Sequence, residues 1–424
     1  MKKQLIQPVK GTRDFYPEQM ALRTWLYNKI RAVSEQFGYQ EYEGPILEYI
    51  ALYAAKSGEE LVKEQSFVLT DRGGDELTLR PELTPTLARM VAQKQNVLVK
   101  PIRWWSFGPF WRYERPQKGR TREFFQWNID LIGSESIQAD AEIAAIGAEF
   151  LRSVGLGPDV LRIQVNDRQL MNAQLRAMGV RDELVSTVFK VIDKREKMDD
   201  QTWREYAASV GLSESQIAAL KAMLDNRELW KQSDELVAFF DAAADLAVGD
   251  YVEFEPSIVR GLDYYTGTVM EARDRDGEFR AIFGGGRYDN LVADVGGDRL
   301  PAVGFAMGDV VIGLVLQKYG KIPSLRTSPS QVLIAAFDAS LIGAARKLAA
   351  QWRASGLRVE LYPDTAKLDR QLKYADAKNI PFVAILGPDE AAQGNVTLKD
   401  LRNKSQQMVA QSQVAQFIAA NLAD

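Results

Sequence analysis

At 424 residues, 46% hydrophobic and 26% charged, the chain is long enough for roughly two or three globular domains. Its 53 basic and 57 acidic side chains leave a net charge of −4, which excludes a global polycation and confines any nucleic acid to local basic surfaces. Cysteine and histidine are both absent, which excludes disulfides, zinc-thiolate sites, cysteine nucleophiles and histidine general bases.

The first 79 residues predict a turn, a long helix and extended segments. A turn-rich entry over residues 11–17 precedes a helical pattern over 18–37. The N-terminus has no apolar signal-peptide core and no apolar run has the length of a membrane span, so we expect a cytoplasmic protein without membrane contact. Pro45 lies in an extended pattern, which suits an edge or interface strand. Residues 66–79 predict a hairpin that turns at a glycine pair.

The next segment, RPELTPTLARMVAQK, predicts the start of a helix. We expect Thr84 to be the N-cap and Pro85 to occupy the first helical position. The Thr84 hydroxyl therefore has two interpretations, helix capping and ligand contact, and the sequence leaves both open. Glu82 has no such structural role, which favours a ligand contact.

Residues 111–133, WRYERPQKGRTREFFQWNIDLIG, predict two strands joined by a basic loop. Residues of the second strand alternate between an apolar face and a polar face, and the polar face carries Phe124, Gln126, Asn128 and Asp130. A solvated edge hairpin gives the same alternation. However, the amide and carboxylate groups under a cationic loop suit a polyphosphate and a small zwitterion better than bulk water.

Beyond the hairpin, the pattern predicts a helix over 137–154, a strand over 160–165 and a helical insertion over 167–246. Extended structure resumes at 251, where Arg260 is either the partner of a structural carboxylate, such as Asp263, or a catalytic cation. The segment FRAIFGGGRYDNLV predicts a hairpin ending in a triple glycine, which permits a tight turn or a close backbone approach. PAVGFAMGDVVIGLVLQKYG predicts a strand entering a buried helix.

A linker rich in proline and hydroxyl residues follows at 321–330. Beyond it, strands near 332–337, 357–362, 382–386 and 396–401 alternate with helices over 341–355 and 367–378, and a final helix follows. This alternation predicts a small α/β domain with a mostly parallel sheet.

Four separated segments, RPELT, RYERPQKGR with FFQWNID, VRGLDYYTGTV and FGGGRYD, resemble the motifs of histidyl-tRNA synthetases, which are class II aminoacyl-tRNA synthetases. The region around LDRQLKYADAKNIPFVAILG resembles their anticodon-binding domain. The resemblance implies an α+β fold with a six-stranded antiparallel sheet flanked by helices. The implied domains are a catalytic core over 1–166 and 249–322, a helical insertion over 167–248 and an anticodon-binding α/β domain over 331–424.

The activity implied by the resemblance is ligation of L-histidine to its tRNA through a histidyl-adenylate, by a homodimer that uses ATP and Mg²⁺. The amino acid's own carboxylate attacks the α-phosphorus, so no protein nucleophile, histidine base or protein-held metal is needed. In the ATP site, Arg112 would hold the α-phosphate, Arg120 the outer phosphates, and Glu114 and Phe124 the adenine.

Histidine binding would fall to Glu82, Thr84, Gln126, Asp130, Arg260, Tyr264 and Tyr265. The first three would hold the α-amino group, and Asp130 would accept a ring N–H alongside Tyr265. Arg260 would reach both the carboxylate and the α-phosphate, and so act as a catalytic residue together with Arg112. In the basic loop, Arg115 and Gln117 would contact the tRNA acceptor end.

The chain departs from the common family pattern at three positions. Asp130 replaces a usual Glu, Phe125 replaces a frequent His on the apolar face, and Val311 replaces the motif 3 arginine that packs on ATP. The missing arginine leaves a second interpretation open, a non-catalytic histidine-binding paralogue such as the regulatory subunit of ATP phosphoribosyltransferase. Such paralogues lack the C-terminal domain and usually lose the basic loop of the segment at residues 111–133, which resembles motif 2 of the family. This chain retains both the domain and the loop.

Overall fold

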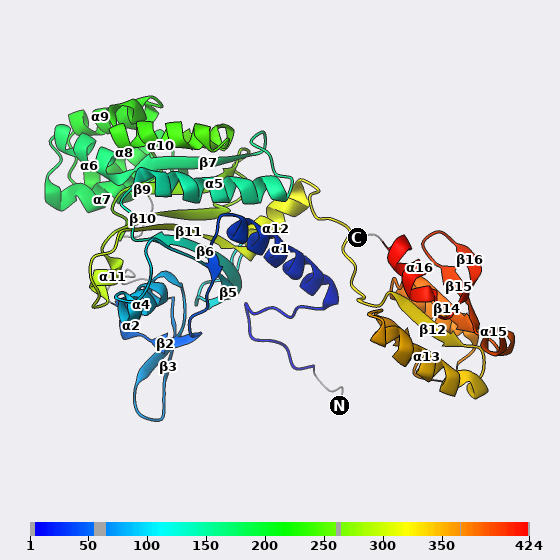
Figure 1. Cartoon of the computed structure of the whole chain (residues 1–424). Helices are drawn as coiled ribbons and strands as arrows, with labels where there is room; N and C mark the ends of the chain where they lie inside the picture. The colour runs from blue at the N-terminus through cyan, green and yellow to red at the C-terminus, as the bar shows by residue number, and fades with distance from the viewer. Residues whose placement is uncertain (1–4, 55–64, 260–263, 365, 423–424) are drawn as a thin grey trace. The chain divides into compact units, whose positions relative to one another are not determined.

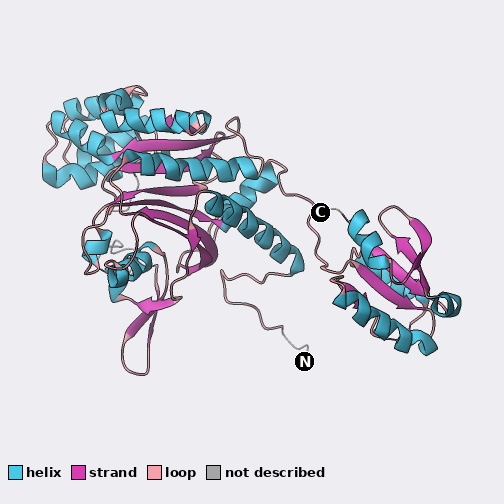
Figure 2. Cartoon of the chain, viewed as in Figure 1, coloured by secondary structure: helices cyan, strands magenta, loops and turns pink. Residues whose placement is uncertain are grey.

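The computed structural model describes residues 5–54, 65–259, 264–364 and 366–422. The chain divides into two compact units, one of Met1–Asp14 with Arg23–Ile322 and one of Phe15–Leu22 with Pro323–Asp424. Figures 1 and 2 show the elements by position in the chain and by type. No helix within the described ranges is long and apolar enough to span a membrane.

The first unit is built on a large sheet. Its strands are β1 (Gln40–Glu41), β5 (Ile102–Trp111), β6 (Glu123–Ile132), β7 (Leu161–Asp167), β8 (Val252–Phe254), β9 (Thr268–Asp274), β10 (Phe283–Tyr288) and β11 (Ala302–Gly308). Their order is β1-β5-β6-β11-β10-β9-β7-β8. The inner six strands pair antiparallel, and the short β1 and β8 pair parallel at the two edges. The antiparallel core implied by the resemblance is therefore confirmed.

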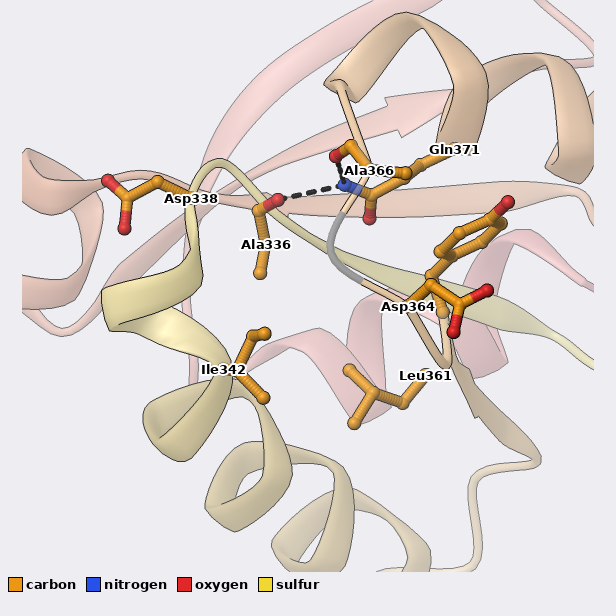
Figure 3. A pocket seen from close by; sticks show the side chains of 8 residues that line it. Ala336, Asp338, Ile342, Leu361, Asp364, Ala366 and Gln371 are labelled. Atoms are coloured by element: carbon orange, nitrogen blue, oxygen red, sulfur yellow. Dashed lines mark hydrogen bonds between the residues drawn. The ribbon is translucent and has the colours of Figure 1, made fainter.

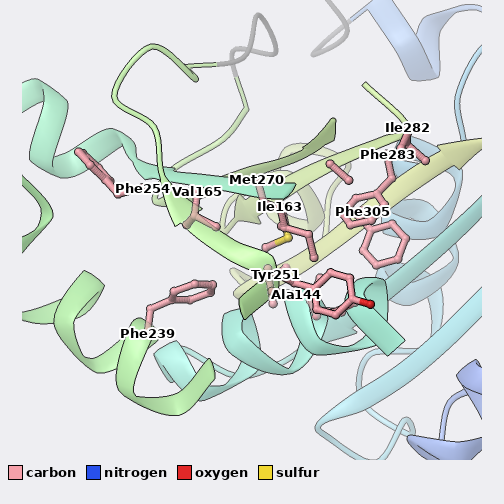
Figure 4. Packing of buried hydrophobic residues seen from close by; sticks show 14 of the residues in the cluster. Ala144, Ile163, Val165, Phe239, Tyr251, Phe254, Met270, Ile282, Phe283 and Phe305 are labelled. Carbon is pink, nitrogen blue, oxygen red and sulfur yellow. The ribbon is translucent and has the colours of Figure 1, made fainter. Parts of the chain in front are cut away.

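One face of this sheet is buried under helices. Trp127 and Ile129, on the apolar side of β6, are fully buried beneath α5 (Ile137–Ser153), whose N-cap Ser136 accepts a hydrogen bond from the Gln138 N–H. Figure 4 shows Ala144 of α5 among the buried side chains of β7, β9, β10 and β11. Because this face holds the core, the alternate side chains of the same strands are left for the opposite face.

The helical pattern predicted over residues 167–246 is confirmed by a run of helices that follows β7 (Figure 1). Its helices are α6 (Arg168–Ala177), α7 (Asp182–Asp193), η1 (Arg195–Lys197), α8 (Asp200–Ser209), α9 (Glu214–Asp225), η2 (Leu229–Gln232), α10 (Asp234–Asp245) and η3 (Gly249–Tyr251). Side-chain N-caps from Asp167, Asp199, Ser213 and Ser233 start four of the α-helices. Phe239 of α10 joins the core that α5 buries, which fixes these helices to the sheet.

A smaller sheet stands apart from the large one. It consists of β2 (Leu47–Tyr49), β4 (Glu76–Leu79) and β3 (Phe67–Thr70) in that order. The predicted hairpin is confirmed as β3–β4, and the predicted edge strand next to Pro45 is β2. The remaining helices of this part of the chain are α1 (Pro17–Gln36), α2 (Ala51–Ala54), α4 (Thr84–Lys94), α11 (Leu291–Asp294) and α12 (Asp309–Lys318).

The triple glycine lies inside a central strand, so the prediction that it ends a hairpin is wrong. Residues 284–286 occupy the middle of β10, between β9 and β11. A Cβ atom on Gly285 would overlap the Gly304 carbonyl and the Phe305 backbone. Glycine is needed here because two strands approach closely, which is the second of the two roles expected for it.

The second unit contains the predicted alternation of strands and helices. Its elements are β12 (Val332–Ala336), η4 (Ala339–Leu341), α13 (Ile342–Ala354), β13 (Val359–Leu361), α14 (Leu368–Ala377), β14 (Phe382–Leu386), α15 (Pro388–Gln393), β15 (Asn395–Asp400), β16 (Ser405–Ala410) and α16 (Val414–Asn421). The sheet order is β13-β12-β14-β15-β16. Among the described strands of this sheet, only β13, β12 and β14 are parallel to one another, so the prediction of a mostly parallel sheet is wrong for the β15–β16 hairpin.

A small hollow lies at the carboxyl end of β12 in this unit (Figure 3). The buried Gln371 donates from Nε2 to the carbonyls of Ala336 at 2.9 Å and Ala366 at 2.8 Å. The hollow encloses about 20 Å³, which is room for about one water molecule. Gln371 therefore has a structural role, because it joins the end of β12 to the segment before α14.

Candidate active site

A cavity of about 590 Å³ lies against the large sheet, lined by residues of β6, β9, β10 and β11, the basic loop after β5 and the start of α12. This volume is typical of a small-molecule site. Among its lining residues are five of the predicted ATP and histidine contacts: Arg112, Glu114, Arg120, Phe124 and Gln126. The predicted tRNA contacts Arg115 and Gln117 are exposed in the loop beside it.

Among the described residues, Arg112 has no carboxylate partner. Its Nε donates to the Pro81 carbonyl at 3.0 Å, and its guanidinium carbon lies 5.4 Å from the centroid of the Phe124 ring. The Phe124 ring also stacks on the Phe110 ring, with centroids 5.9 Å apart. A guanidinium fixed by a carbonyl and an aromatic ring keeps its charge available for an anionic ligand.

Arg120 and Glu114 form an ion pair across the loop, with Nη1 and Oε2 at 2.9 Å. The backbone of Gln117 pairs with that of Arg120, so the loop is itself a tight turn. In the ligand-free protein the two predicted ATP contacts therefore neutralise each other. Phosphate binding by Arg120 requires that it share or leave this carboxylate.

The floor of the cavity is made of residues with small side chains. Gly284 on β10 lies opposite Ala306 on β11, and both line the cavity. A Cβ atom on Gly308 would meet nothing within 4 Å. The alternation that buries Phe305 and Met307 on the covered face leaves glycine and alanine on the open face, which provides room for a bulky ligand.

Asp130 lies farther along β6, in a pocket of tyrosines. The Tyr288 hydroxyl donates to Asp130 Oδ1 at 2.6 Å, and the Tyr264 ring lies 6.0 Å from that of Tyr288 and 5.0 Å from that of Tyr265. Burial raises the pKa of Asp130 to about 7, although the hydrogen bond from Tyr288 opposes the shift. A ring N–H presented to this carboxylate would favour its ionised form.

Tyr288 is a site residue to which the sequence analysis gave no role. It belongs to the GGGRYD segment, and its position beside Asp130 depends on the pairing of β10 with β11 and of β11 with β6. Gly304 lies between them, because it is the β11 neighbour of Asp130 and the position of its missing Cβ is occupied by Asp130 Oδ1.

Thr84 does not cap its helix, so that prediction is wrong. The helix α4 begins at Thr84, its N-cap is Leu83, and no side-chain capping bond is formed. Pro85 consequently occupies the second helical position, where a missing N–H is equally harmless. Thr84 is half-buried and Glu82 is buried, and a ligand contact by either side chain stays a prediction.

The motif 3 region has a structural role in place of the missing arginine. Asp309 accepts from the Phe125 N–H at 2.9 Å and pairs with Arg13 at 2.9 Å, while Val311 lines the cavity as a neutral residue. Arg280 lines the same cavity and adds positive charge to it, whereas Arg273 is paired at 2.9 Å with Glu271, which also lines the cavity. Arg260, with the carboxylate partner considered for it at Asp263, lies outside the described residues.

Phe125 is confirmed as a packing residue. It stacks on Phe107 with centroids 5.9 Å apart, and Arg23 lies over its ring at 4.3 Å. Its replacement of a histidine is thus on the covered side of the sheet and away from the cavity.

Comparisons with known proteins agree with this geometry. A family model described as histidyl-tRNA synthetase matches residues 11–309, and one described as anticodon binding domain matches residues 331–421. The histidine–tRNA ligase of Thermoplasma volcanium is 38% identical over 97% of this chain and 98% of the relative. The chloroplastic/mitochondrial histidine–tRNA ligase of Arabidopsis thaliana is 37% identical over 96% of this chain and 85% of the relative.

Two solved structures share the fold. The histidyl-tRNA synthetase of Nostoc sp. PCC 7120 matches with a TM-score of 0.85 and 25% identity, over 99% of this chain and 100% of the other. A protein of Bacillus halodurans C described as an ATP phosphoribosyltransferase regulatory subunit/histidyl-tRNA synthetase matches with a TM-score of 0.73 and 23% identity, over 88% of this chain and 97% of the other. The second likeness concerns the fold alone.

Proposed function

The chain belongs to the histidyl-tRNA synthetase family, and from this premise we propose how its residues ligate L-histidine to tRNA with the energy of ATP. A carboxylate oxygen of histidine attacks the α-phosphorus of ATP, and pyrophosphate leaves. A ribose hydroxyl at the 3′ end of the tRNA then attacks the histidyl carbonyl, and AMP leaves. The observation that carries the proposal is the cavity lined by Arg112 and Arg120, on the face of β6 that also bears the buried carboxylate of Asp130.

The proposed ATP contacts lie on the hairpin β5–β6 and its loop. Arg112 binds the α-phosphate. Its positive charge stabilises the transition state more than the ground state, because negative charge accumulates on the phosphate oxygens as the reaction proceeds. Arg120 exchanges Glu114 for the outer phosphates, and the released Glu114 accepts from the adenine amino group. Phe124 packs against the base. Mg²⁺ would be held by the phosphates of ATP and by water, and it would supply further positive charge there.

The proposed histidine contacts continue along the same strand. Glu82, Thr84 and Gln126 hold the α-amino group with one carboxylate, one hydroxyl and one amide. Asp130 accepts a ring N–H, and Tyr264 and Tyr265 border the ring. For Arg260, a catalytic contact with the substrate carboxylate and α-phosphate rests on the resemblance alone.

We propose a homodimer formed through the small sheet. Exposed apolar side chains group on this sheet and just before it: Leu47 and Tyr49 of β2, Val68 and Leu69 of β3, and Ile46, which precedes β2. Such a grouping commonly marks an interface. Sedimentation velocity is expected to report twice the chain mass of 47.5 kDa, and Leu47→Glu is expected to shift the protein towards monomers. A wild-type protein that sediments as a monomer at micromolar concentration contradicts the interface. A cytoplasmic location and tRNA contacts by Arg115 and Gln117 stay predictions from the sequence.

ATP–pyrophosphate exchange on the purified protein tests the proposed function. We expect exchange that depends on histidine and is not supported by the other amino acids. An imidazole ring can donate its N–H to the Asp130 carboxylate and lie among the neighbouring tyrosines. The regulatory interpretation predicts histidine binding without exchange at saturating ATP and Mg²⁺. It is disfavoured by the anticodon-binding match over residues 331–421 and by the intact cations of the loop.

A further inference from the structure

Three polar groups lie in one row across the large sheet and lack a hydrogen-bond partner in the part of the chain that the structure describes. They are the hydroxyl of Tyr42, Oγ of Ser106 and Nδ2 of Asn128. Ser106 is directly opposite Asn128 in the β5–β6 ladder, and both side chains are at least 95% buried. Buried donors without acceptors are rare in natural proteins because they lose their bonds to water.

Tyr42 belongs to the same row. It follows β1 directly, and its N–H donates to the Trp105 carbonyl at 2.9 Å. Its ring lies 5.3 Å from that of Trp104, which is the β5 neighbour of Asp130. The Tyr42 hydroxyl is therefore on the open face of the sheet, close enough to Asp130 and Tyr288 for the charges of the three groups to influence one another.

The row lies between the two ends of the predicted histidine site. Asn128 is two residues from Gln126, which lines the cavity, and two residues from Asp130 in the other direction. Its β11 neighbour, Ala306, also lines the cavity. A substrate that reaches from Gln126 to Asp130 must pass over this row.

The chemistry of the row complements a neutral imidazole. Such a ring has one N–H, which needs an acceptor, and one nitrogen lone pair, which needs a donor. Asp130 supplies the acceptor, and the three unpaired groups all supply donors. Burial raises the pKa of Tyr42 well above its ordinary value, so its hydroxyl remains protonated.

We propose that Tyr42, Ser106 and Asn128 together hold one water molecule, and that this water donates to the ring nitrogen of histidine that Asp130 does not reach. The water accepts from the Tyr42 hydroxyl and the Asn128 amide, and it donates to Ser106 Oγ and to the ring nitrogen. This inference rests on the proposed function and adds a specificity determinant to it. The row discriminates histidine from ring systems that offer an N–H and no lone pair, because such a ring would leave the donors unpaired.

Tyr42→Phe tests the proposal because it keeps the ring against Trp104 and removes only the hydroxyl. The substrates are histidine and the two pyrrolylalanines, each of which replaces one ring nitrogen by CH. We expect kcat/KM for histidine in pyrophosphate exchange to fall roughly tenfold, the effect of one lost hydrogen bond. For the pyrrolylalanine that keeps only the nitrogen facing Asp130, the change is expected to stay below about twofold. The wild-type preference for histidine over this analogue should shrink accordingly.

Ser106→Ala and Tyr39→Phe complete the test. Ser106→Ala removes an unpaired donor, so the ligand-free protein should keep or gain thermal stability while histidine binds more weakly. Tyr39 donates to Glu142 at 2.8 Å on the covered side of the sheet, so Tyr39→Phe should lower stability and leave kcat/KM for histidine unchanged. Unchanged histidine kinetics in Tyr42→Phe, or equal losses with histidine and both analogues, overturns the proposal. A wild-type protein without histidine-dependent exchange overturns the proposed function instead.

Discussion

Arg112→Lys is expected to lower the rate of histidyl-adenylate formation by roughly a hundredfold or more, with only a small change in melting temperature. Lysine keeps the charge but loses the planar fork, and it cannot reproduce both the bond to the Pro81 carbonyl and a two-point contact with a phosphate. Pre-steady-state measurement of adenylate formation, beside thermal unfolding, checks the expectation. KM for histidine should change little, because Arg112 acts on the phosphates.

Arg122 provides a matched control on the same hairpin. Its Nε donates to the Glu114 carbonyl at 3.3 Å and its guanidinium lies over the Tyr113 ring at 4.1 Å, so it resembles Arg112 in every contact except the cavity. Arg122→Lys is expected to leave the adenylation rate within about threefold of wild type. Equal losses in the two variants would assign the Arg112 effect to the shape of the hairpin and remove it from the mechanism.

Arg287→Met is expected to lower the free energy of unfolding by about 3–5 kcal/mol. The buried Arg287 pairs with Asp140 on α5, whose side chain is wholly buried, and also donates to the carbonyls of Ser134 at 2.9 Å and Ser136 at 3.1 Å. Removing the guanidinium leaves a buried carboxylate without its cation. Urea unfolding at neutral pH measures the loss.

Two further variants separate burial from ion pairing. Arg287→Met combined with Asp140→Leu should recover part of the lost stability, because no charge is then left unpaired in the core. Arg299→Met removes an exposed guanidinium that pairs with Glu135 at 2.7 Å and with Asp289 at 3.6 Å, and it should cost less than about 1 kcal/mol. If Arg287→Met lowers the free energy of unfolding no more than Arg299→Met does, the buried ion pair contributes no more to stability than an exposed one.

The open face of β6 was predictable from sequence because alternation is a local property. Phe124, Gln126 and Asp130 needed only the period of a strand to be placed together. Tyr42 follows β1, Ser106 lies on β5 and Tyr288 on β10, and nothing in their local sequence specifies which strands become neighbours. Strand pairing is fixed by tertiary packing, so these residues were found only in the folded chain.

Glycine and threonine produced the wrong predictions for a related reason. A glycine run permits a turn and a close strand contact equally, and residues 284–286 adopt the contact because Phe305 packs against them. Thr84 before proline fits a cap, but the helix already starts at Thr84. Likewise, the alternation beyond residue 330 identified β12, β13 and β14 but missed β16, whose mostly polar and exposed residues carry little apolar signal.

The contact between Gly304 and Asp130 limits where the amino acid that this protein accepts can be changed by laboratory evolution. A Cβ atom on residue 304 would overlap both Asp130 Oδ1 and the Ile129 carbonyl oxygen. Shortening residue 130 removes the first overlap and leaves the second, because the carbonyl belongs to the backbone of the neighbouring strand. Position 304 is therefore closed to substitution whichever side chain residue 130 carries, and the accessible changes lie at residue 130 and at the tyrosines beside it.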